Sequence, residues 1–177
     1  MMTDEKPDLR RIVLTGFMGS GKSTVGPLLA ARLGWRFVDV DDVIEAEAGV
    51  KIAELFARQG EAAFRQREHE AIARLAEGEE LVLALGGGAI ETEKNRAVLL
   101  EGEGTLLVHL EVELETTLRR CAGREGTRPI LADRANLAAR YEKRLPLYRE
   151  AHVSVKVDEL TPGEAVEAIV GAAGVRE

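Results

Sequence analysis

The sequence has little of several residue types, and each shortage narrows what the protein could be. Its single cysteine, Cys121, excludes an internal disulfide and suits a reducing compartment. Aromatic residues make up only 4% of the chain, so we expect a core built mainly from Ala, Val, Leu and Ile. No apolar run approaches the ~20 residues of a membrane-spanning helix, and the charged start MMTDEKPDLRR lacks the apolar stretch of a secretion signal. We therefore expect a cytoplasmic protein without a membrane partner.

Positive charge is also in short supply, although it is unevenly distributed. The 177 residues carry a net charge of −7, which argues against general nucleic-acid binding. Between Arg119 and Arg149, however, nine basic residues stand against three acidic ones. Clustered arginine in an acidic protein is typical of a site for compact anions, because the guanidinium fork matches phosphate and carboxylate groups. A solvated helix face explains the same composition equally well.

Short apolar, β-branched runs alternate with longer amphipathic stretches along the whole chain. This alternation is typical of βαβ units around a parallel sheet. There is no internal repeat and no Pro/Gly/Ser-rich linker, so we expect one domain over residues 1–177. The segment 122–133 (AGREGTRPILAD) has no clear period, and we expect a mobile functional loop there.

The same pattern places the expected elements along the chain. We expect strands at Arg11–Thr15, Arg36–Val40, Leu81–Leu85, Thr105–Leu110 and Val153–Val157. We expect helices at Lys22–Leu33, Asp42–Ala48, Ile52–Arg58, Glu61–Ala76, Lys94–Glu101, Leu114–Cys121, Asn136–Glu150 and Pro162–Ala172.

The strongest motif is the run GFMGSGKS at residues 16–23, which fits the pattern G-x-x-x-x-G-K-[ST]. It follows the apolar strand IVLT and precedes an apolar-periodic helix, which is the context that the pattern requires. Glycines let successive backbone N–H groups point at one phosphate, and the helix N-terminus adds favourable potential. Lys22 can reach the β- and γ-phosphates during catalysis, and the Ser23 hydroxyl can ligate Mg²⁺. The predicted ATP-binding residues of this loop are Gly19, Ser20, Gly21, Lys22, Ser23 and Thr24.

Three aspartates end the second expected strand, in the segment FVDVDD. Asp39 and Asp41 are two residues apart, so in an extended strand both would point to the same face. Beside a P-loop, one carboxylate can steer Mg²⁺ and its waters while the other accepts the proton of an attacking hydroxyl. Helix capping is the alternative. We predict that Asp42 caps the following helix, and for Asp39 and Asp41 the motif alone supports both interpretations equally.

From Ile12 to about Pro162 the chain resembles the shikimate kinase family. Six segments of that family occur in order: GFMGSGKS, FVDVDDVIE, LFARQGEAAFRQRE, LALGGGAI, RPIL and YEKRLPLY. The resemblance implies a P-loop kinase with a five-stranded parallel sheet flanked by helices, and a mobile lid at about 122–133. It also implies phosphorylation of the 3-hydroxyl of shikimate by ATP, with Mg²⁺ as cofactor, on the route to aromatic amino acids.

The resemblance implies roles for single residues around the acceptor. Asp39 matches the carboxylate that holds Mg²⁺ through water, beside the ligand Ser23, and Asp41 matches the aspartate that engages the shikimate hydroxyls and acts as the base. Arg65 and Arg144 match the pair that grips the shikimate carboxylate, and Gly87 matches the glycine whose N–H faces the substrate. Physical chemistry supports this set, because a monoanion with three hydroxyls needs arginine forks, a short acid and exposed backbone N–H groups.

Two further arginines are matched to the nucleotide. Arg120 resembles the arginine that lies against adenine, and Arg128 matches the lid arginine that reaches the transferring phosphates. Plainer interpretations exist for the substrate arginines: Arg65 could form an i,i+3 ion pair with Glu68, and Arg144 could be a solvated helix charge.

Other functions make different demands on the sequence. A kinase for another hydroxy acid such as gluconate, or for a nucleoside monophosphate, would share the P-loop and lid. A non-catalytic ATP-binding switch would need no acceptor residues, so Asp41, Arg65, Gly87 and Arg144 together count against it. The three histidines are scattered and suggest no metal site. We therefore expect a monomeric shikimate kinase.

Overall fold

One parallel sheet lies at the centre of the protein. The computed structural model describes residues 8–123 and 133–175, and within them five strands pair in the order β2-β3-β1-β4-β5. The predicted strands are confirmed to within one residue at each end. They span Arg11–Thr15 (β1), Arg36–Asp39 (β2), Leu81–Ala84 (β3), Thr105–Glu111 (β4) and Val153–Lys156 (β5).

The central strand β1 carries the middle of the core. Ile12 lies opposite Val82 of β3 and Leu106 of β4, and Ile12, Val13 and Leu14 have no solvent-exposed surface. A parallel strand covered on both faces is buried throughout, which explains why IVLT is a continuous apolar run without alternation. The strand therefore fixes the start of the glycine-rich loop rigidly.

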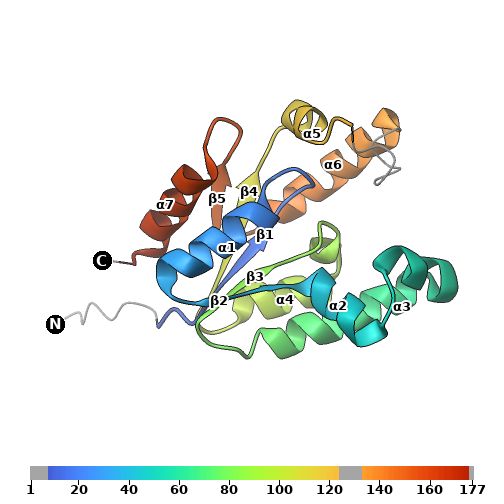
Figure 1. Ribbon diagram of the computed structural model, residues 1–177, viewed down its shortest axis with the longest axis horizontal. Coiled ribbons are helices and arrows are strands. Elements are labelled where there is room, and N and C mark those ends of the chain that lie inside the picture. Colours follow the sequence, from blue (N-terminus) through green and yellow to red (C-terminus); the bar gives the residue numbers. More distant parts are fainter. Residues whose placement is uncertain (1–7, 124–132, 176–177) are drawn as a thin grey trace.

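Helices cover both faces of the sheet (Figure 1). The helices α1 and α7 pack against each other on one face, and α4 lies on β4 beside α3 on the opposite face (Figure 1). None of the helices in the described part of the chain combines the length and apolar character needed to cross a bilayer. The helices span Lys22–Leu33 (α1), Val40–Ala48 (α2), Ile52–Leu75 (α3), Glu93–Glu101 (α4), Leu114–Arg120 (α5), Arg134–Tyr148 (α6) and Pro162–Ala173 (α7). A 3₁₀ turn at Ala89–Glu91 (η1) was not predicted from the sequence.

Gly60 divides α3 into two helical parts. Its backbone has φ 84° and ψ 171°, a conformation outside the helical region that only glycine adopts readily. The two helices predicted on either side of this point, Ile52–Arg58 and Glu61–Ala76, therefore correspond to the two parts of α3.

The start of α2 differs from the prediction. The strand β2 ends at Asp39 and α2 begins at Val40, so the N-cap is Asp39, whose carboxylate accepts the Asp41 N–H at 2.9 Å. Asp42 was predicted as the cap, and this was wrong, because Asp42 already lies exposed in the first turn of the helix. The argument that Asp39 and Asp41 share one face of a strand fails for the same reason. Both side chains nevertheless reach the same cleft.

Candidate active site

The glycine-rich loop connects β1 to α1. Gly19 and Gly21 have φ angles of 77° and 94°, which allow the chain to turn back on itself. Gly21 holds the N-cap position of α1 and has no side chain to accept the first helical N–H groups, so these remain available to a phosphate. Lys22 Nζ lies over the loop and donates to the Gly16 carbonyl at 2.5 Å. The loop is thus shaped as an anion cradle.

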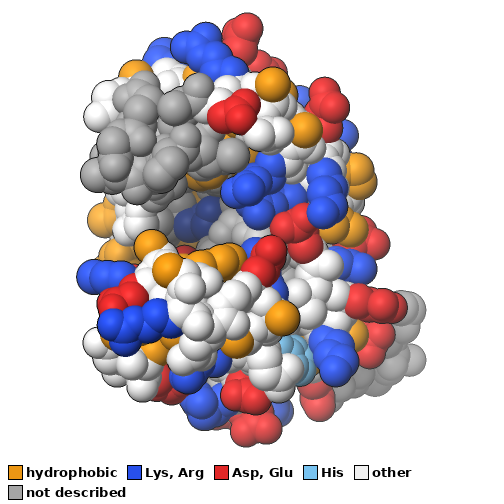
Figure 2. All heavy atoms as spheres, turned by 90° about the vertical axis from the view of Figure 1, so that its right-hand side faces the viewer, with side chains coloured by type: hydrophobic (Ala, Val, Ile, Leu, Met, Phe, Trp, Pro, Cys, Tyr) orange, Lys and Arg blue, Asp and Glu red, His pale blue; other side chains and the backbone are white. Residues whose placement is uncertain are grey.

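A cavity of about 590 Å³ opens above this loop, at the carboxyl ends of the strands. Figure 2 shows the hollowed face of the molecule, with Lys and Arg side chains inside and beside the hollow. Arg65 instead lines an adjacent hollow of about 430 Å³, which shares Arg144 with the first. The predicted site residues that line the larger cavity are Gly19, Ser20, Gly21, Lys22, Ser23, Thr24, Asp39, Asp41, Gly87, Arg120 and Arg144.

Asp41 has the properties of a general base. Burial raises its pKa to about 6, and the negative charges of Asp39 and Glu68 add to the effect. Its Oδ1 is buried and has no hydrogen-bond partner among the described residues. A Cβ atom on Gly86 would lie 2.8 Å from this oxygen, so glycine is what allows the carboxylate to lie against the backbone. The carboxylate can accept a proton from a hydroxyl placed in the cleft.

Asp39 and Ser23 place side-chain oxygen atoms in the cavity, beside the glycine-rich loop. Burial raises the pKa of Asp39, although the backbone N–H of Asp41 and the charge of Lys22 oppose the shift. The described residues form no cluster of three or more His, Cys, Asp or Glu side chains. Mg²⁺ does not need one, since it usually takes one or two carboxylates together with phosphate oxygens and water. The residues present therefore fit Mg²⁺.

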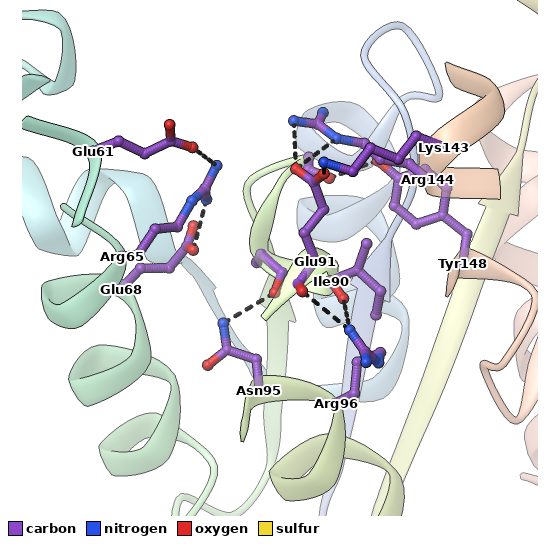
Figure 3. Close-up of polar contacts among 12 residues, drawn as sticks. Glu61, Arg65, Glu68, Ile90, Glu91, Asn95, Arg96, Lys143, Arg144 and Tyr148 are labelled. Carbon is purple, nitrogen blue, oxygen red and sulfur yellow. Dashed lines mark hydrogen bonds and ion pairs between the residues drawn. The ribbon is translucent and has the colours of Figure 1, made fainter. Parts of the chain in front are cut away.

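The two predicted substrate arginines, Arg65 and Arg144, converge on the glycine run at residues 86–88. A Cβ atom on Gly88 would collide with Arg65 Nη2 and would lie 2.9 Å from Arg144 Nη2. Arg144 is not a solvated charge, because only 8% of its side chain is exposed. Arg65 does pair with Glu68, at 2.8 Å, as the alternative interpretation predicted (Figure 3), and its Nη2 also lies against Gly88. The two guanidinium groups thus lie against a glycine backbone that carries no side chains. A small carboxylate would fit there.

Tyr148 forms a hydrogen bond with the backbone of the glycine run. Its hydroxyl donates to the Gly87 carbonyl at 2.6 Å, and its ring stacks on His109 with a centroid distance of 5.1 Å. Burial lowers the pKa of His109 to about 4, so this ring is neutral at pH 7. Tyr148 thus joins the glycine run to a neutral ring on β4.

Arg120 contacts two segments that line the cavity. Its guanidinium donates to the Gly19 carbonyl and to the Val157 carbonyl, each at 2.9 Å. It therefore joins the P-loop to the segment before α7, where Pro162 also lines the cavity.

The family model for shikimate kinase matches residues 18–173. A curated shikimate kinase from Salinibacter ruber is 42% identical over 94% of this chain and 83% of the relative, and one from Moorella thermoacetica is 46% identical over 83% and 84%. The chain belongs to the shikimate kinase family. A shikimate kinase from Acinetobacter baumannii, solved in complex with shikimate, superposes with a TM-score of 0.86 at 36% identity, covering 94% of this chain and 93% of that one.

Family membership makes the protein a kinase and confirms the predicted P-loop kinase fold. Arg128, and with it most of the predicted lid at 122–133, lies outside the described residues. Glu68, Glu91 and Tyr148 contact residues of the site, and the sequence analysis did not assign them to it. Tyr148 and Glu68 stand inside the quoted segments YEKRLPLY and LFARQGEAAFRQRE, whereas nothing in the sequence around Glu91 indicated a contact with Arg144.

Proposed function

We propose that the protein transfers the γ-phosphoryl group of ATP to the 3-hydroxyl of shikimate. The observation that carries the proposal is the convergence of Asp41, Arg65 and Arg144 on the glycine run 86–88, beside a P-loop. The cavity and the hollow next to it thus offer a base, two guanidinium groups and a backbone without side chains. These match the hydroxyls and the carboxylate of shikimate.

The reaction releases the proton of the substrate hydroxyl, so a base must accept it. As the oxygen of the substrate hydroxyl forms its bond to the γ-phosphorus, the bond from that phosphorus to the β–γ bridging oxygen breaks and ADP leaves. The hydroxyl proton passes to the Asp41 carboxylate, which lines the cavity beside the glycine run. A pKa raised to about 6 makes Asp41 a stronger base than an ordinary aspartate while leaving it ionised at neutral pH.

The arginine pair holds the substrate at its other end. We assign the shikimate carboxylate to Arg65 and Arg144, and a backbone N–H contact to Gly87. Positioning of this kind accounts for much of the rate in phosphoryl transfer, where the protein does little covalent chemistry. Lys22 and the N–H groups at the start of α1 are assigned to the phosphates.

We assign Mg²⁺ to Ser23 and, through water, to Asp39. When bound there, the ion would neutralise negative charge on the phosphates. Arg128 is assigned to the transferring phosphates and Arg120 to the adenine side. A single domain over residues 1–177 and a cytoplasmic monomer complete the proposal, and light scattering on the purified protein would test the oligomeric state.

An acceptor panel tests the reaction. ADP release should require both Mg²⁺ and shikimate, whereas gluconate and AMP should leave it at the background rate. Gluconate separates this function from that of a kinase for another hydroxy acid, and AMP separates it from a nucleotide kinase. Equal turnover with gluconate, or ADP release that no acceptor stimulates, would refute the assignment.

A further inference from the structure

The turn η1 places one acidic side chain beside the substrate site. It follows the glycine run directly and ends at Glu91. Its backbone is held from α4, where Asn95 Nδ2 donates to the Ala89 carbonyl at 3.0 Å and Arg96 Nη1 donates to the Ile90 carbonyl at 2.8 Å (Figure 3). Because the turn is fixed on this side, the Glu91 side chain extends from a rigid base.

The Glu91 carboxylate reaches across to α6 and contacts two basic residues there. Its Oε2 accepts from Arg144 Nε at 3.2 Å and also lies 3.2 Å from Arg144 Nη2, and its Oε1 lies 3.1 Å from Lys143 Nζ. The Lys143 side chain is 74% exposed, whereas that of Arg144 is 8% exposed and that of Glu91 is 23% exposed. The contact with Arg144 is therefore the sheltered one, and surface screening weakens it less.

The contacts divide the Arg144 guanidinium into two edges. Glu91 takes the Nε–Nη2 edge. The Nη1–Nη2 edge lies toward the glycine run, with Nη1 3.3 Å from where a Cβ on Gly87 would stand and Nη2 2.9 Å from where a Cβ on Gly88 would stand. A guanidinium can bind one carboxylate on each edge. A substrate carboxylate can therefore use the remaining edge without displacing Glu91.

We propose that Glu91 is a positioning residue, which fixes the rotamer of Arg144 so that its Nη1–Nη2 edge faces the substrate carboxylate. The inference rests on the proposed function, because it presumes an anionic acceptor at Arg144. An unrestrained arginine side chain would lose rotamer freedom on binding substrate, and the contact with Glu91 removes that cost in advance. The opposite arrangement, in which Glu91 competes with the substrate for Arg144, predicts the opposite effect of removing it.

Kinetics on Glu91→Gln, which keeps the shape and removes the charge, test the proposal. The KM for shikimate should rise by about tenfold, as for a weakened charged hydrogen bond, with the KM for ATP unchanged. Glu93→Gln, at an exposed position in the first turn of α4, is the matched control and should behave as wild type. Glu91→Asp, which keeps the charge but shortens the reach, should give an intermediate KM.

A double-mutant cycle separates positioning from a general structural effect. In an Arg144→Ala background, Glu91→Gln should no longer change the shikimate KM, because the residue through which Glu91 acts is gone. An unchanged or lowered KM in the single variant would overturn the proposal, as would an equal rise in both backgrounds. A wild-type protein that does not phosphorylate shikimate would instead refute the proposed function, and this inference with it.

Discussion

Replacing Asp41 by Asn should stabilise the protein while abolishing its activity. The Asp41 carboxylate is buried beside Asp39 and Glu68, and this environment raises its pKa to about 6. Keeping the carboxylate ionised at neutral pH therefore costs folding free energy. Asparagine has nearly the same shape and no charge, so it removes that cost together with the base.

The magnitude follows from the two pKa values. An unfolded chain has an Asp pKa of ~3.9, and the folded value is about 6. Because the folded value is the higher one, the group contributes stability below about pH 4, and this contribution is lost as the pH rises through about 6. Two pKa units correspond to about 3 kcal/mol at ~1.36 kcal/mol each, and partial solvent access reduces the figure to about 2 kcal/mol.

Urea unfolding without nucleotide or Mg²⁺ measures the effect. At about pH 7.5, Asp41→Asn should raise the free energy of unfolding by about 2 kcal/mol, and the gain should fall to roughly half at about pH 5. Asp42→Asn, exposed in the same helical turn, is the control and should lose a few tenths of a kcal/mol of helix-dipole stabilisation. A destabilised Asp41→Asn protein, or a gain that does not depend on pH, would refute the reasoning.

Three further predictions concern the substrate and phosphate contacts. Arg144→Ala should weaken shikimate binding in calorimetry by roughly 1.5–3 kcal/mol and leave ATP binding unchanged. An unaltered shikimate affinity would show that Arg144 does not contact the substrate. Gly88→Ala should raise the shikimate KM steeply, because the added methyl group meets Arg65 and Arg144, and an unchanged KM would show that the cleft lies elsewhere. Arg128→Ala should lower kcat at least roughly a hundredfold with little change in the ATP KM, and Arg124→Ala should do far less in the same steady-state assay; equal kcat values would contradict a chemical role for Arg128.

The sequence was sufficient to predict the sheet and the glycine-rich loop that follows its central strand. Both depend on local patterns, because an apolar strand, a glycine-rich turn and a helix stand next to one another in residues 11–33. The carboxyl ends of parallel strands meet at one edge of the sheet, which brings Asp39 and Asp41 close to Lys22. The cap of α2 was misplaced because β2 ends one residue earlier than its apolar pattern suggests.

The acceptor end depends on contacts between distant segments, which periodicity does not encode. Arg65 and Arg144 stand on α3 and α6, and by themselves they are ordinary helix charges, so only the family resemblance selected them. Their convergence on Gly88 requires the tertiary fold. The contact of Glu91 with Arg144 spans 53 residues and was visible only in the structure.

Phosphorus NMR of one reaction mixture tests the central claim most directly. Protein, Mg²⁺, ATP and shikimate should give equimolar ADP and a single phosphomonoester, coupled to the proton on carbon 3 of the shikimate ring. Omitting shikimate should leave ATP intact. Inorganic phosphate in place of the ester, or an ester at another hydroxyl, would contradict the account of how this cleft holds its substrate.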